Sequence, residues 1–168
     1  MKKLKTVRPR NWLYELLVLL EGLLIFALWW LILGSRKQIF LCWAITYLAL
    51  AWTLRGIFQR HHRRGMKLLR RKKFSEAAVS FQNSFHYFAS HPRIDKYRFI
   101  TMFSSNAISF QHMALNNLGI CFLHLGRNQE ALETFENLAG LNGDIPNLQL
   151  VIEALRKHIQ EAESSAAQ

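Results

Sequence analysis

The sequence predicts an all-α protein: a hairpin of two transmembrane-length helices, then an α-hairpin domain closed by a C-terminal capping helix. Two long apolar runs lie near the start of the 168-residue chain, and basic residues gather at their ends. After them, apolar residues recur at helical spacing, and no segment alternates as a strand would. We therefore expect a basic N-terminus and hairpin over 1–58, with spans over about 12–33 and 38–57. A helical domain over 59–160 and a flexible tail over 161–168 follow.

The first apolar run, residues 12–33, is broken only by Glu15, Glu21 and Gly22. A helix of this length rises about 33 Å at roughly 1.5 Å per residue, which is enough to cross a hydrocarbon core of about 30 Å. A cleaved secretory signal has a shorter apolar core and ends in a small-residue cleavage site, and neither feature is present. We therefore expect a retained membrane span.

The second run, residues 38–57, follows the turn at residues 34–37 so closely that only an antiparallel hairpin can join the two runs. Several tryptophan residues lie near the ends of the runs, as expected at a membrane interface. Two adjacent helices that are apolar on every face could also be buried in a soluble protein, but only a much larger protein could cover both. A membrane hairpin is therefore the preferred interpretation.

Positive charge marks the orientation of this hairpin. Five basic residues precede the first run and nine lie between Arg55 and Lys73, whereas the turn has only Arg36 and Lys37. Basic residues are enriched on the cytoplasmic side of a membrane, so we expect a multi-pass membrane protein with both termini in the cytoplasm.

One segment, from Ala114 to Leu138, has a fixed pattern of large and small residues. Its pattern positions are Leu115, Leu118, Gly119, Phe122, Leu125, Gly126, Ala131 and Phe135. Small residues at 119 and 131 allow two antiparallel helices to approach closely, and a glycine at 126 supplies the positive φ that ends the first helix. This pattern resembles the tetratricopeptide repeat (TPR) family.

A weaker copy of the pattern comes earlier. Its members are Gly65, Leu68, Phe74, Ala77 and Phe81, with Lys72-Lys73 at the turn in place of Leu-Gly. The repeat length of the family is about 34 residues, whereas 54 residues separate the two pattern glycines here. We therefore expect an insert over roughly 93–112, with a short helix near 95–103. Ser104 or Ser105 should then cap the next helix.

The resemblance implies a membrane-anchored TPR-like protein that binds a protein or peptide in a groove lined by the first helix of each pair. The positions that it places on this face are Met66, Leu69, Arg70, Asn116, Ile120, Leu123 and His124, with His62 and Met113 beside them. Two repeats form almost no groove, so the same residues could instead pack against the insert or the last helix. The insert resembles linkers of small bacterial repeat proteins, which makes the bacterial cytoplasmic membrane the expected location.

Glu21 is a second candidate, because it lies about 13 Å into the first span at roughly 1.5 Å per residue. An ionisable group at that depth is costly and is usually functional. It could bind a basic residue of a partner, or be protonated, or be a neutral acid that is hydrogen-bonded to Tyr47 or Thr53. These alternatives stay open at the level of sequence.

Residues 59–73 form the densest basic stretch of the chain. The basic side chains that we expect at lipid head groups are Arg60, Arg63, Arg64, Arg70, Arg71, Lys72 and Lys73. The stretch has no interleaved aromatic residue and no nucleic-acid-binding motif, so nucleic acid is not the expected partner.

The sequence contains no nucleophile with a partner base, no phosphate-binding loop and no paired carboxylates, so we expect no catalytic residue and no enzyme. Cys42, Cys121 and the scattered histidines lack ligand spacing, so we expect neither a metal nor a cofactor. The expected function is a membrane-anchored adaptor for a cytoplasmic protein or peptide. The alternative is a small accessory subunit of a membrane complex that acts through its hairpin.

Overall fold

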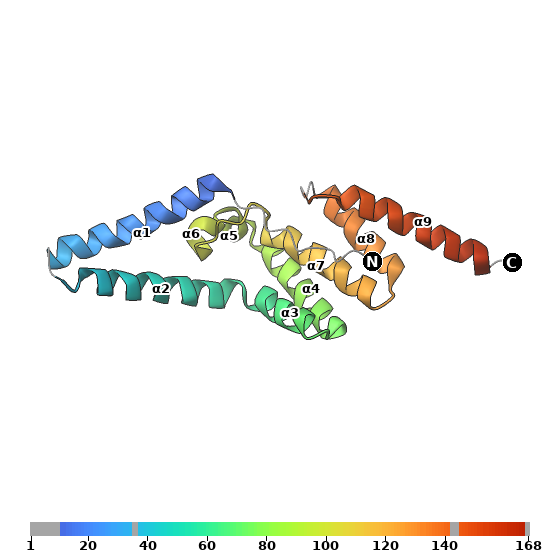
Figure 1. Cartoon of the computed structure of the whole chain (residues 1–168), viewed down its shortest axis with the longest axis horizontal. Helices are drawn as coiled ribbons and strands as arrows, with labels where there is room; N and C mark the ends of the chain where they lie inside the picture. Colours follow the sequence, from blue (N-terminus) through green and yellow to red (C-terminus); the bar gives the residue numbers. More distant parts are fainter. Residues whose placement is uncertain (1–10, 35–36, 142–144, 167–168) are drawn as a thin grey trace. The chain divides into compact units, whose positions relative to one another are not determined.

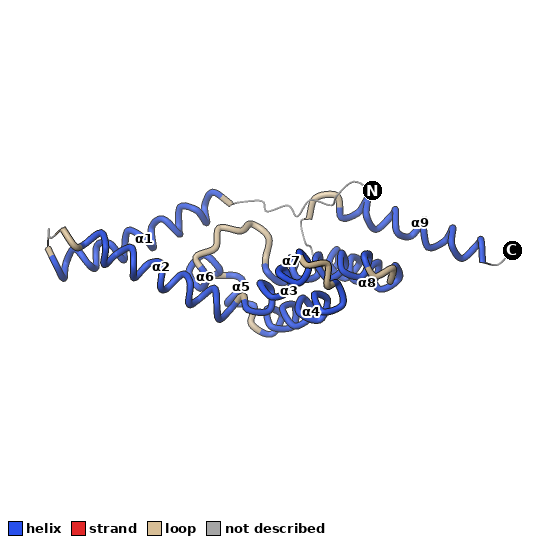
Figure 2. The backbone as a smooth tube through the Cα atoms, turned by 60° about the horizontal axis from the view of Figure 1, so that its bottom comes forward, coloured by secondary structure: helices blue, strands red, loops and turns tan. Residues whose placement is uncertain are grey.

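The computed structural model describes residues 11–34, 37–141 and 145–166, and within these ranges the chain forms helices and loops without a strand (Figure 2). The all-α prediction is therefore confirmed. The helices are α1 (Trp12–Leu33), α2 (Ile39–Phe58), α3 (Arg60–Arg70), α4 (Phe74–Ser90), α5 (Pro92–Lys96), α6 (Arg98–Met102), α7 (Phe110–His124), α8 (Asn128–Gly140) and α9 (Leu148–Ala166). The basic N-terminus, Arg36 of the turn and the end of the expected tail lie outside the described residues.

The described residues divide into two compact units that do not follow the order of the chain. The hairpin unit contains the described residues up to Arg60 together with Pro92–Ala107, and the repeat unit contains His61–His91 and the described residues from Ile108 onward. The sequence prediction placed the whole of 59–160 in one helical domain. The structure instead assigns the segment Pro92–Ala107 to the unit of the hairpin.

The two long helices of the hairpin unit begin and end close to their predicted bounds. The side chain of Asn11 caps α1 by accepting a hydrogen bond of 3.0 Å from the Leu13 amide. At its other end, Gly34 has a φ of +62°, a value that glycine adopts more readily than other residues. Helix α2 ends at Phe58, and α3 begins after the single non-helical residue Gln59.

Aromatic side chains hold α1 against α2. The Trp43 indole donates a 2.8 Å hydrogen bond to the Gly22 carbonyl, and the Trp29 indole donates a 3.1 Å hydrogen bond to the Thr46 hydroxyl. The ring of Phe26 lies 6.1 Å from that of Trp43. Figure 1 shows α1 and α2 diverging from the loop that joins them, and α6 contacts both helices at the open end.

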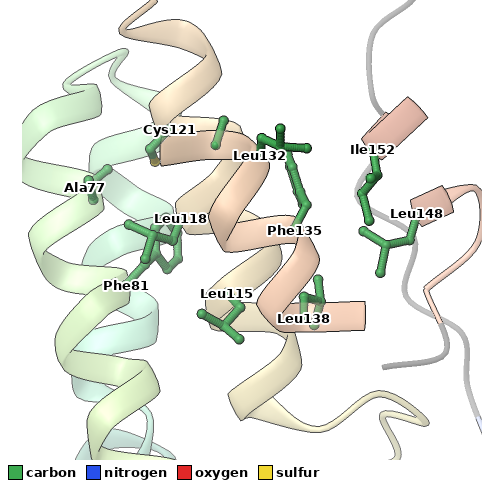
Figure 3. Close-up of a cluster of buried hydrophobic side chains, with 12 residues drawn as sticks. Ala77, Phe81, Leu115, Leu118, Cys121, Leu132, Phe135, Leu138, Leu148 and Ile152 are labelled. Carbon is green, nitrogen blue, oxygen red and sulfur yellow. The ribbon is translucent and has the colours of Figure 1, made fainter. Parts of the chain in front are cut away.

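In the repeat unit, α4 packs against α7, α7 against α8, and α8 against α9. Figure 3 shows the buried side chains that form the core: Ala77, Phe81, Leu115, Leu118, Cys121, Leu132, Phe135, Leu138, Leu148 and Ile152. Each large apolar side chain of this kind stabilises the fold by roughly 1.5–3 kcal/mol when fully buried. Burial raises the pKa of the Cys121 thiol to about 12, so this cysteine acts as a small apolar side chain.

Helix α9 is longer than predicted, because it continues to Ala166 and includes most of the segment that was expected to be a tail from residue 161. Glu161 and Glu163 favour helix, and Lys157 lies 3.8 Å from Glu161 one turn later. Arg156 reaches across to Glu136 of α8 at 2.6 Å. Since both side chains are exposed, this ion pair contributes at most about 1 kcal/mol.

Candidate functional site

The repeat unit contains two α-hairpins, α3–α4 and α7–α8, whose turns have the same geometry. In the first turn the Lys72 amide donates to the Leu69 carbonyl at 3.0 Å, and in the second the Gly126 amide donates to the Leu123 carbonyl at 3.1 Å. Each pair of equivalent residues is separated by the 54 positions that separate the two pattern glycines. Lys72 adopts a φ of +59° and Gly126 a φ of +72°, so lysine takes the left-handed conformation that glycine supplies in the second copy.

The next residues of the two turns also correspond. Lys73 has φ −87° and ψ 71°, and Arg127 has φ −86° and ψ 66°. Each of these bases precedes the second helix of its hairpin and pairs with a glutamate three residues later, Glu76 in the first copy and Glu130 in the second.

The glycines of the pattern lie where the two helices of each hairpin approach most closely. A Cβ atom added to Gly119 would lie 2.6 Å from the Phe135 ring, and one added to Gly65 would lie 2.8 Å from the Phe81 ring. The predicted close approach at Gly119 is therefore confirmed. The same packing occurs in the first hairpin, where the sequence pattern was weaker.

The seven side chains expected to line a groove all belong to α3 and α7 of this unit. Met66, Leu69, Ile120 and Leu123 are half-buried and pack against the core, and Asn116 is also half-buried. Arg70 and His124 are exposed and occupy equivalent positions at the ends of the two helices. The ring of His124 stacks on that of Phe74, with 4.3 Å between centroids.

His62 does not lie on an open face. It is buried, and its ring lies 5.7 Å from that of Phe81 and 5.4 Å from that of Phe110. Phe110 begins α7, so the start of this helix covers the position that the resemblance placed beside the groove.

The insert differs from its prediction. In place of one helix near 95–103, the structure has α5 and α6, and neither Ser104 nor Ser105 caps the next helix. Phe103 adopts a left-handed φ of +48°, and the Ser104 amide donates back to the Arg98 carbonyl at 3.1 Å, so this turn ends α6. The N-cap of α7 is Ser109, whose hydroxyl accepts a hydrogen bond of 3.1 Å from the His112 amide.

The side chains expected at lipid head groups share one property, which is exposure to solvent. These exposed residues are Arg60, Arg63, Arg64, Arg70, Arg71, Lys72 and Lys73. Lys73 contacts Glu76 at 2.9 Å in an exposed pair, which water screens strongly.

Glu21 lies in the hairpin unit with both carboxyl oxygen atoms shielded, and neither oxygen has a hydrogen-bond partner within the described part of the chain. The hydrogen bond to Tyr47 or Thr53, which is one of the alternatives that the sequence leaves open, is therefore not formed. The neighbouring residue, Gly22, packs near the Tyr47 and Trp43 rings.

Arg55 links the hairpin to the insert, and Arg98 binds carbonyls within the insert itself. Arg55 of α2 donates from Nε to the Met102 carbonyl at 3.0 Å and from Nη2 to the Phe103 carbonyl at 2.6 Å. Its position near the end of the second apolar run marks Arg55 in the sequence, since a basic residue there needs acceptors. Arg98 lies in an insert without periodicity, so no sequence pattern marks it.

Comparison with known proteins adds no family to this description. No family model matches the chain, and no curated protein and no solved structure matches it. The resemblance to the TPR family therefore depends on the residues of the two hairpins alone.

Proposed function

We propose that this protein is a membrane-anchored scaffold whose TPR-like α-hairpins bind a cytoplasmic protein or peptide. The observation that carries the proposal is the equivalence of the two hairpins, which share turn geometry and glycine–phenylalanine packing at equivalent positions. Repeated α-hairpins stack so that their first helices lie side by side, and such surfaces commonly bind peptides. Arg70 and His124 occupy equivalent positions on those first helices and are exposed.

The anchor is proposed from the surface of α1 and α2. Both helices are long and apolar enough to span a membrane, and only 6 % of the most apolar stretch of α1 and 11 % of that of α2 are buried. A core helix of a soluble protein would be mostly covered, whereas leucines along the length of α1 are exposed. We therefore propose that this exposed apolar surface faces lipid.

The orientation follows from charge. The nine basic residues between Arg55 and Lys73 lie at and just after the end of α2, and basic flanks favour the cytoplasmic side. Both termini and the repeat unit are then cytoplasmic, in the bacterial cytoplasmic membrane. The exposed bases of α3 and its turn would contact anionic head groups, at about 1 kcal/mol for each basic residue near the surface.

The test is a quantitative capture experiment on detergent-solubilised full-length protein. The double variant Arg70→Ala/His124→Ala removes the two exposed side chains of the proposed binding face. Lys157→Ala/His158→Ala is the matched control, because it removes a similar pair of exposed side chains from α9. We expect the first variant to bind its partner roughly tenfold more weakly, which corresponds to about 1.4 kcal/mol, and the control to bind normally. Equal binding by both variants would exclude this face.

A second candidate function is an accessory subunit that contacts its complex through the hairpin, and the unpaired Glu21 is the observation that favours it. Both carboxyl oxygens are shielded and lack a hydrogen-bond partner among the described residues, so a basic side chain of a partner would supply the missing bonds. In the same capture experiment, Glu21→Leu should keep the partner if the repeat unit is the recognition element. Loss of the partner in Glu21→Leu, with normal capture by Arg70→Ala/His124→Ala, would favour the second function.

A further inference from the structure

The segment Pro92–Ala107 belongs to the hairpin unit, and its helix α6 contacts both α1 and α2. It contacts α1 through a 3.1 Å hydrogen bond from the Asn11 amide to the Ser105 carbonyl. On the side of α2, the ring of Phe103 lies 5.2 Å from that of Tyr47. Figure 1 shows α6 in the space where α1 and α2 diverge.

These contacts differ in depth on the two helices: those on α1 lie at its start, at Asn11 and Tyr14, whereas the Phe103 ring reaches Tyr47 within α2. Tyr47 precedes the end of α2 at Phe58 by 11 residues, which is about 16 Å at roughly 1.5 Å per residue. If α2 crosses the membrane over its length, the Phe103 ring extends toward the acyl chains of one leaflet from a backbone that Arg55 holds nearer the end of α2. Non-helical backbone is tolerated at such depth only where other protein groups satisfy its polar atoms.

Arg55 and Arg98 donate hydrogen bonds to these polar backbone atoms. Arg98 is buried, and its guanidinium donates to the carbonyls of Asp95 at 2.9 Å, Asn106 at 2.7 Å and Ala107 at 2.6 Å. Its charge also lies 4.8 Å from the centre of the Tyr14 ring on α1. With the two bonds from Arg55, five backbone carbonyls of the segment receive arginine donors.

The exposed side chains of the segment are both apolar and basic. Ile100 is 54 % exposed and Tyr97 is 45 % exposed. The Lys96 amine lies 5.6 Å from the centre of the Tyr97 ring, and Arg93 is exposed. A tyrosine with adjacent basic residues and an exposed isoleucine is the composition expected where protein meets the head groups and outer acyl chains.

We propose that residues 92–107 form a re-entrant element that contacts the lipid bilayer, with Ile100 and Tyr97 facing lipid and with Arg55 and Arg98 satisfying its backbone. This inference rests on the proposed membrane hairpin. It adds a lipid-binding surface that the two spans do not contain.

The test measures lipid exposure at Ile100 in the full-length protein, reconstituted in vesicles of phosphatidylcholine and phosphatidylglycerol. A spin label is attached through Ile100→Cys in a Cys42→Ala/Cys121→Ala background. Its accessibility to oxygen, which concentrates in lipid, is compared with its accessibility to a water-soluble nickel complex. Leu24→Cys on α1 and Leu150→Cys on α9 serve as the lipid and water controls, since both positions are exposed.

The oxygen-to-nickel ratio at position 100 should exceed that at position 150 severalfold and approach that at position 24. A ratio at 100 equal to that at 150, with a lipid-like value at 24, overturns the inference and leaves the hairpin standing. Water-like values at both 24 and 100 overturn the membrane hairpin itself, and the inference with it.

A second variant tests the role of the buried arginine. Arg98→Gln removes donors to the segment carbonyls, whereas Arg93→Gln changes an exposed arginine of the same segment. The ratio at position 100 should fall severalfold toward the water value in Arg98→Gln and stay unchanged in Arg93→Gln, with the ratio at position 24 constant in both. An unchanged ratio in Arg98→Gln overturns the proposal that Arg98 holds the element in the bilayer.

Discussion

At the scale of single residues, two glycines decide how closely the helices of the repeat unit approach. The Phe135 ring occupies the space beside Gly119, and the Phe81 ring occupies the space beside Gly65. Phe81 and Phe135 are themselves almost fully buried, so neither ring has room to move away from an added methyl group.

Gly119→Ala should therefore destabilise the protein by roughly 1–3 kcal/mol through overpacking. Gly140→Ala is the matched control, because a Cβ atom at Gly140 meets nothing within 4 Å. There the higher helix propensity of alanine should keep or raise stability, by up to about 1 kcal/mol. Thermal unfolding of the detergent-solubilised protein, followed by circular dichroism, measures both changes. Equal melting temperatures for the parent and Gly119→Ala would show that the Phe135 ring can relax.

The sequence predicted part of this residue-level detail. Gly119 and Phe135 could be identified because they match a spaced pattern in which small and large side chains face each other. The burial of His62 could not be predicted, because it depends on Phe110, which lies 48 residues later and reaches it only through the tertiary fold.

At the scale of elements, the turn of each α-hairpin requires one residue with positive φ. The second turn has Gly126 at this position, but the first has Lys72. A residue with a Cβ atom in the left-handed region costs about 1–2 kcal/mol relative to its preferred conformation. The exposed side chain of Lys72 offsets none of this cost by burial.

Lys72→Gly should therefore stabilise the first hairpin by up to about 1 kcal/mol, after allowance for the greater freedom of glycine in the unfolded chain. Gly126→Ala should destabilise the second hairpin by a similar amount, because alanine must adopt the φ of +72°. Chemical denaturation curves of the two variants should shift in opposite directions. Shifts in the same direction would mean that the two turns are not equivalent.

Helix positions could be predicted well where a long apolar run or a spaced pattern marks them, as for residues 12–33. The course of the insert could not be predicted, because it depends on the left-handed conformation of Phe103. A phenylalanine in the sequence gives no indication of that conformation. Ser104 has the residue type of an N-cap, but in the structure its amide donates a hydrogen bond to the Arg98 carbonyl at the end of α6.

At the scale of the whole molecule, the hairpin unit and the repeat unit are interleaved along the chain. Periodicity within a window of residues cannot detect this, since Arg55 and its acceptor Met102 are 47 residues apart. A truncation after Lys73 would therefore remove α6 from the hairpin unit as well as most of the repeat unit. Point variants therefore distinguish the roles of the two units better than such a truncation does.

The repeat unit should fold without the segment that belongs to the hairpin. The Phe88 and Phe110 rings stack with 5.3 Å between centroids, so the end of α4 lies near the start of α7 and a short linker can join them. Residues 61–168, with 92–107 replaced by a Gly-Ser linker, should be helical and unfold in one cooperative transition by circular dichroism. A gradual transition, or loss of helix, would show that the repeat unit depends on the segment.

The long separation between Arg55 and its acceptors also sets an order of events during synthesis. At roughly 5–20 residues per second, the ribosome adds Met102 about 2–9 s after Arg55, as follows from the 47 residues between them. Both apolar helices and the first α-hairpin have been translated by then. The hairpin unit is thus the first to begin and cannot be completed until the chain between its two parts has been made.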